Sequence, residues 1–108
     1  MDGYEYLRLG KSLKAKYISD LKNLMNEFIY SNISFKVGDT VEVKNITFPG
    51  KYIVDEIYMN FDDDFDSVVS PSCYLHAINV TGRRINERNV PNQIGGGFRA
   101  TDVVKVIK

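Results

Sequence analysis

The sequence has few of the residues that form disulfides and metal sites. Among its 108 residues, Cys73 is the only cysteine, His76 is the only histidine, and tryptophan is absent. One cysteine excludes an intramolecular disulfide, and one cysteine with one histidine cannot supply the four ligands of a structural zinc site. We therefore expect neither a metal nor a cofactor, and we interpret Cys73 as a small buried residue in a strand.

A long apolar stretch is also missing. No run approaches the roughly 18 residues of a transmembrane helix, and the acidic residues 1–5 do not resemble a signal peptide. Hydrophobic residues make up 44% and charged residues 26% of the chain, which is ordinary for a soluble domain. Because single domains most often have about 100–150 residues, we expect one cytoplasmic domain spanning residues 1–108, without a membrane partner.

The net charge is zero, with 14 basic and 14 acidic residues. This balance argues against a non-specific nucleic-acid coat, for which a strongly basic domain is expected. The charges are nevertheless unevenly distributed. Residues 37–70 contain two basic and eight acidic residues, whereas residues 71–108 contain six basic and two acidic residues. An acidic middle and a basic C-terminal third favour electrostatic steering toward a charged partner.

The first third of the chain has the periodicity of an amphipathic helix. Between residues 11 and 30, apolar residues recur mostly three or four positions apart, which places them on one helical face. Ser31 and Asn32 are predicted to end this helix, and Asp2 is a candidate cap for an earlier turn. Left exposed, the apolar face would be a self-association site, so a homo-oligomer through this face is one possibility.

The remaining two-thirds is predicted to form short strands. We expect them at residues 35–43 with a turn at Gly38 and Asp39, at 52–59 with a bulge at Asp55 and Glu56, and at 73–81, 98–100 and 104–107. One helical turn is expected at residues 101–103. Residues 60–72 and 82–97 are predicted to be polar loops. We interpret the glycines at 95–97 as flexible positions that permit positive φ, because no helix follows to complete a phosphate-binding loop.

His76 is poorly placed for catalysis in this prediction. Residues three apart in an extended strand point to opposite faces, so His76 and Cys73 do not form a dyad. No hydrolase motif with paired carboxylates accompanies them. We therefore predict that the protein is not an enzyme and has no catalytic residue.

The order of the predicted strands resembles a small β-barrel of the Src-homology-3-like class, as found in KOW and Tudor domains and in many small phage and bacterial accessory proteins. The resemblance covers about residues 35–108 and rests on Phe35-x-Val37-Gly38-Asp39-x-Val41-x-Val43, Gly50-Lys51-Tyr52-x-Val54-x-x-Ile57, Tyr74-Leu75 and Phe98-x-Ala100-x-Asp102-Val103-x-Lys105-Val106. It implies an α+β fold, with an N-terminal amphipathic helix (residues 1–32) packed on a five-stranded, mostly antiparallel barrel. Such a pattern supports the fold rather than a function.

The most acidic segment is a candidate surface for a protein partner. It contains four aspartates, Asp62, Asp63, Asp64 and Asp66, and two nearby aromatic residues, Tyr58 and Phe61. The spacing of the aspartates matches the first ligands of a calcium loop. However, Ser67 replaces the glycine of that motif and Cys73 replaces its bidentate glutamate, so we predict no metal here.

The second candidate surface is basic and would bind nucleic acid through Arg83, Arg84, Arg88, Arg99 and Lys105. Nucleic-acid modules of this kind usually interleave aromatic residues, which we instead expect in the core at Tyr52, Tyr74 and Phe98. We therefore predict a non-catalytic module of the accessory or inhibitor type that binds a protein partner through charged loops. Nucleic-acid binding is the alternative, and a structural subunit of a larger assembly is the third hypothesis.

Overall fold

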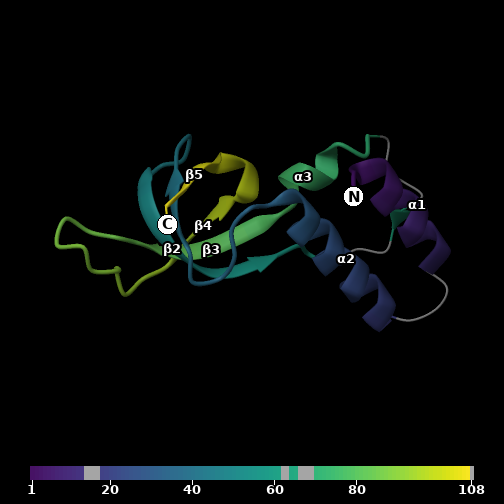
Figure 1. The fold of residues 1–108 in the computed structure, drawn as a ribbon, viewed down its shortest axis with the longest axis horizontal. Coiled ribbons are helices and arrows are strands. Elements are labelled where there is room, and N and C mark those ends of the chain that lie inside the picture. Colours follow the sequence, from purple (N-terminus) through teal and green to yellow (C-terminus); the bar gives the residue numbers. More distant parts are fainter. Residues whose placement is uncertain (14–17, 62–63, 66–69, 108) are drawn as a thin grey trace.

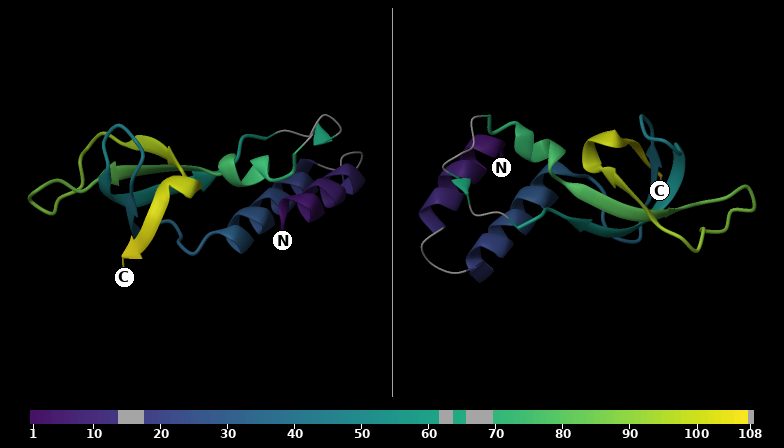
Figure 2. Two further views of the ribbon diagram at one scale, coloured as in Figure 1. Left: turned by 90° about the horizontal axis from the view of Figure 1, so that it is seen from above. Right: turned by 180° about the vertical axis from the view of Figure 1, so that it is seen from behind.

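Helices and strands occupy opposite ends of an elongated molecule (Figure 1). The computed structural model describes residues 1–13, 18–61, 64–65 and 70–107 and measures 50 × 24 × 22 Å. The helical end contains α1 (Gly3–Leu13), α2 (Ile18–Asn32) and the short α3 (Cys73–His76). The other end is a sheet, from which a hairpin of residues 85–95 projects away from the helices (Figure 2). No helix in the described ranges has the length and apolar character to cross a membrane.

The structure has two helices, α1 and α2, where the sequence predicted one long helix. The predicted cap is confirmed, because the Glu5 N–H donates to Asp2 Oδ1 at 2.8 Å at the start of α1. In α2, the predicted apolar face is buried and the helix ends at Asn32 as expected. The Asn32 Nδ2 donates to the carbonyls of Phe28 and Met1, which ties the end of α2 to the start of the chain.

The five strands form one antiparallel sheet in the order β4-β3-β2-β1-β5. Their bounds are Thr40–Val43 (β1), Gly50–Tyr58 (β2), Asn79–Arg84 (β3), Gly96–Arg99 (β4) and Val103–Ile107 (β5). The predicted bulge in β2 is confirmed by a register shift between Val54 and Glu56. A one-turn helix, η2 (Ala100–Asp102), joins β4 to β5 near the predicted position.

The α+β class and the five-stranded antiparallel sheet are confirmed, but the sheet is not closed. Within the described residues, β4 and β5 are the two edges and no ladder joins them. The predicted first strand is also shorter than expected. The predicted turn is present at Gly38, whose φ of 93° glycine adopts without strain, and strand β1 begins at Thr40.

The prediction of a strand over residues 73–81 is wrong in its first half. Residues 73–76 form α3, where the Tyr74 N–H donates to the Pro71 carbonyl, and the strand begins at Asn79. Cys73 is exposed rather than buried, and His76 is exposed too. Because residues three apart share one face of a helix, the argument that placed these two side chains on opposite faces also fails.

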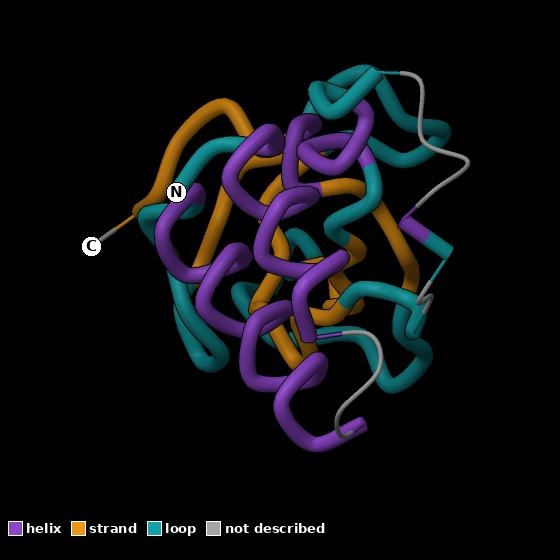
Figure 3. The backbone as a smooth tube through the Cα atoms, turned by 90° about the vertical axis from the view of Figure 1, so that its right-hand side faces the viewer, coloured by secondary structure: helices purple, strands orange, loops and turns teal. Residues whose placement is uncertain are grey.

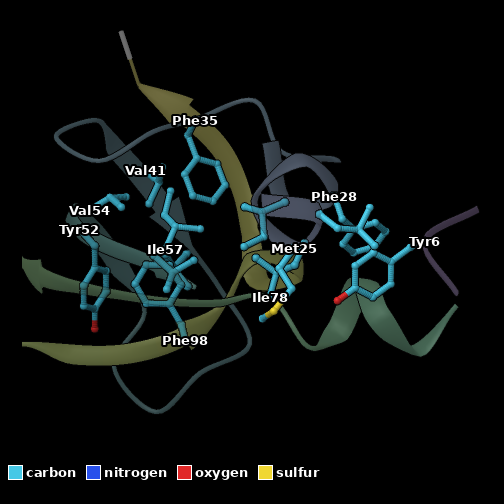
Figure 4. Packing of buried hydrophobic residues seen from close by; sticks show 14 of the residues in the cluster. Tyr6, Met25, Phe28, Phe35, Val41, Tyr52, Val54, Ile57, Ile78 and Phe98 are labelled. Atoms are coloured by element: carbon cyan, nitrogen blue, oxygen red, sulfur yellow. The ribbon is translucent and has the colours of Figure 1, made fainter. Parts of the chain in front are cut away.

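One core runs from the helices into the sheet, with the helices stacked against one end of the strands (Figures 3 and 4). At the helical end, Tyr6 packs on Phe28, Phe65 and Tyr74 with ring centroids 4.6–5.7 Å apart. This contact with Tyr6 explains why Tyr74 lies on a helix, because tertiary packing overrides local strand propensity. The apolar face of α2 is buried in this core, so it does not supply the predicted self-association surface.

Candidate functional site

A groove of about 770 Å³ lies beside the edge strand β4. One wall is the loop of residues 44–49 between β1 and β2, and the other is formed by β3, β4 and η2. The groove is rich in aromatic and apolar side chains, among them Ile46, Phe48, Tyr52, Tyr58, Val80 and Phe98. Concave apolar surfaces with a few polar groups are the usual form of a binding site.

The floor of the groove is a pair of aromatic rings. Tyr52 on β2 and Phe98 on β4 have ring centroids 5.1 Å apart at an interplanar angle of 59°, and both are buried as predicted (Figure 4). Their strands lie on either side of β3. Both side chains point into the core on the same face of the sheet as Val54 and Val80. The floor is therefore part of the sheet core and is fixed before any ligand arrives.

The loop that forms the opposite wall is held in place by hydrogen bonds at its C-terminal end. The Tyr52 hydroxyl donates to the Phe48 carbonyl at 2.6 Å, and the Arg84 Nε donates to the Pro49 carbonyl at 3.2 Å. Asn45, with φ of 63°, and Gly50, with φ of 149°, turn the chain at the two ends of the loop. These contacts anchor the backbone of the loop, on which the Phe48 side chain is 69% exposed beside the groove.

Two charged residues, Arg99 and Asp102, line the far end of the groove. The Asp102 carboxylate accepts the Arg99 backbone N–H at 3.2 Å, which caps η2 and leaves the Arg99 side chain exposed. Asp102 is half-buried and is the only carboxylate residue in the described lining. The groove therefore combines an aromatic floor with one balanced pair of charges.

A smaller cavity of about 320 Å³ lies where the helical end meets the sheet. Its lining brings Asp64, His76 and Arg99 together with the aromatic rings of Tyr6 and Tyr74. The sequence analysis assigned His76 to a strand and gave Asp64 and Arg99 to two different candidate surfaces. In the described part of the chain, no three histidine, cysteine or acidic side chains are grouped so as to hold a metal ion.

The acidic candidate surface is only partly described. Asp62, Asp63 and Asp66 lie outside the described residues, and Asp64 is exposed. Phe61 is 42% exposed and lines a small hollow on α2, which shares Tyr58 with the groove. Of the three described candidates, Tyr58, Phe61 and Asp64, only Tyr58 lines the groove beside β4.

The basic candidates are spread over three strands, β3, β4 and β5, and the projecting hairpin. Arg83 makes an ion pair with Asp55 at 3.1 Å, and Arg84 holds the 44–49 loop. The others are dispersed as well. Arg88 lies in the projecting hairpin, Arg99 lies at the groove, and Lys105 lies on β5 opposite Glu42.

The projecting hairpin is more ordered than the polar loop that the sequence predicted. Asn86 Oδ1 accepts the backbone N–H groups of Arg88 and Val90, and the Asn86 N–H donates to the Val90 carbonyl. Asn89 adopts a positive φ of 58° at the turn, as asparagine readily does. These bonds form a self-contained turn whose apolar residues Val90 and Ile94 are exposed.

Sequence reasoning missed the central residue of the groove, Phe48. The available signal was an aromatic residue in the turn Thr47-Phe48-Pro49-Gly50, where polar residues are usual. Comparison of the chain with protein-family models, curated proteins and solved structures finds no match. The inference of function therefore depends on the geometry alone.

Proposed function

We propose that the protein is a non-catalytic binding module whose groove beside β4 holds a segment of a partner protein. The observation that carries this proposal is Phe48, whose side chain is 69% exposed while its backbone carbonyl accepts the Tyr52 hydroxyl. Aromatic side chains, phenylalanine among them, are enriched in the cores of protein interfaces. The exposure of Phe48 in the free chain favours a partner that covers it.

The charges support a protein partner over nucleic acid. Arg83 is paired with Asp55, and Lys105 and Lys51 both lie opposite Glu42 in the sheet. At the groove, Arg99 is accompanied by Asp102. Phosphate recognition requires several unpaired cations on one surface, whereas balanced charges suit a protein surface.

The residues that line the groove suit binding better than catalysis. Asp102, the one carboxylate residue of the described groove, already accepts the Arg99 N–H. A general base must be free to reach the proton that it removes. We therefore propose recognition rather than catalysis.

We also propose that the sheet is of the Src-homology-3-like class. The strand order β4-β3-β2-β1-β5 and the single turn of η2 before β5 support this proposal. In such a fold, loops carry the binding function while the strands supply a rigid frame. The 44–49 loop and the edge of β4 have these two roles here.

Site-specific photo-crosslinking tests the proposed function. A photoreactive phenylalanine derivative at position 48 is expected to crosslink a discrete host protein. The same derivative at Val37, which is 51% exposed and lies outside the groove lining, is the matched control. Equal crosslinking at both positions, or none at position 48, would contradict the proposal. Tight, salt-sensitive binding of a generic oligonucleotide would instead support the nucleic-acid alternative.

A further inference from the structure

We propose that the partner segment binds as an added β-strand along β4, with alternate side chains entering the groove. This inference rests on the proposed function and specifies its mode. The occupant is an extended segment of a different protein, with apolar residues at alternate positions and an acidic residue near Arg99. Backbone hydrogen bonds would provide much of the affinity, and the groove would select the side chains.

The backbone of β4 is available for such pairing. The Ala100 N–H donates to the Ile78 carbonyl, and Phe98 and Gly96 continue this alternation opposite Val80 and Gly82. In an antiparallel ladder, the intervening residues direct their N–H and C=O groups away from the paired strand. Gly97 and Arg99 are such residues, and within the described chain β4 has no strand on that side. Because Asp102 already accepts the Arg99 N–H, the outward N–H of β4 that is left for a partner strand is that of Gly97.

The three glycines around this edge are not required by the fold. Positive φ among glycines occurs at Gly38 and Gly50, so the interpretation of residues 95–97 as positive-φ positions is wrong. A Cβ added at Gly95, Gly96 or Gly97 would approach its nearest neighbour at 3.4, 4.0 or 3.9 Å, which is ordinary van der Waals contact. Glycine in a strand that has room for a side chain suits the close approach of another backbone.

The opposite edge of the sheet is protected, which distinguishes it from β4. Strand β5 carries Lys105, a charged residue of the kind that blocks pairing with another strand. Residues 33–35 also lie beside it, since they share the lining of a hollow of about 260 Å³ with residues 103–106. Strand β4 has no proline and carries one charge, Arg99, at its end. Within the described residues, the β5 edge of the sheet is therefore protected against pairing with another strand, whereas the β4 edge is open.

The chemistry of the occupant follows from the side-chain positions. Gly96 and Phe98 face the groove, where the Gly96 Cβ position is 4.0 Å from the Tyr52 ring. Across from them, a partner strand would place large apolar side chains, because an aromatic residue covers a cross-strand glycine well. The exposed Arg99 guanidinium at the end of β4 favours an acidic residue there.

Peptides selected against the intact protein from a random display library provide the probe. Strand addition predicts that selected peptides alternate apolar residues. N-methylation of every second amide should weaken binding about tenfold or more, because those amides donate to β4, while methylation of the intervening amides should be tolerated. Since this readout alters the peptide alone, it does not depend on the folding of a protein variant.

A protein variant gives the complementary readout. Gly97→Lys should reduce peptide binding about tenfold or more, because an edge lysine blocks strand pairing. Val104→Lys, on the exposed face of β5, is the matched control and should bind as the natural protein does. Circular dichroism melts of both variants establish that each is folded.

The outcomes separate this inference from the proposed function. Peptides that require Phe48 but tolerate Gly97→Lys and methylation at every amide would overturn strand addition and leave protein binding intact. Absence of peptides that require Phe48, together with no crosslink at position 48, would overturn both. A dimer in sedimentation velocity that Gly97→Lys dissociates would identify a second copy as the occupant, and would overturn the assignment to a different protein.

Discussion

The glycines of the helical end and those of the sheet edge differ in what surrounds them. A Cβ at Gly3 would overlap the Pro71 carbonyl oxygen, and one at Gly10 would overlap the Phe65 ring. At Gly96 and Gly97 the nearest atoms are 4.0 and 3.9 Å away. Packing therefore requires glycine at positions 3 and 10, but it does not explain the glycines at positions 96 and 97. The room beside Gly96 and Gly97 supports the proposed binding edge at β4.

The two phenylalanines at the two ends provide the largest contrast. Phe28 is 0% exposed and packs on Tyr6, so Phe28→Ala should lower the free energy of unfolding by about 3–5 kcal/mol. Phe48→Ala should change it by less than about 0.5 kcal/mol, because the side chain is 69% exposed. Urea denaturation measures both. Equal destabilisation would show that Phe48 belongs to the core rather than to a binding surface.

A smaller contrast is expected between glycines. Gly10→Ala should destabilise the protein by about 1–3 kcal/mol, because the new methyl group overlaps Phe65 and outweighs the gain in helix propensity. Gly96→Ala should leave the midpoint of thermal unfolding nearly unchanged. A stabilised Gly10→Ala variant would show that the helical end is more loosely packed than its contacts indicate.

The smallest effect concerns the start of α1. Asp2→Ala removes the side-chain acceptor of the Glu5 N–H and should cost about 1 kcal/mol. Asp2→Asn keeps an acceptor oxygen and should recover most of this loss. Thermal melts of the two variants measure the difference. Identical melts for both would indicate that this bond does not stabilise the helical end.

Local patterns predicted much of this fold. The spacing of apolar residues in α2, the bulge after Val54, and the turn before β5 all depend on residues close in sequence. The prediction failed at α3, because the Tyr74 ring packs on the ring of Tyr6, which is distant in the sequence. No local pattern contains that contact.

The groove was harder to predict for the same physical reason. Its walls are the 44–49 loop and β4, which are separated by about half of the chain and meet through the Tyr52–Phe98 pair. The sequence identified charged segments instead, because charge is visible residue by residue. In the structure these charges are dispersed or paired, as Arg83 is with Asp55.

Partner capture by two phenylalanine variants tests the central claim most directly. Phe48 lines the groove, whereas Phe61 lies beside the acidic segment and is 42% exposed. The protein crosslinked through position 48 is titrated, in purified form, against both variants. We predict that Phe48→Ala stays folded and loses most binding, while Phe61→Ala retains it. Retained binding by Phe48→Ala with loss in Phe61→Ala would contradict this account and place the interface at the acidic segment.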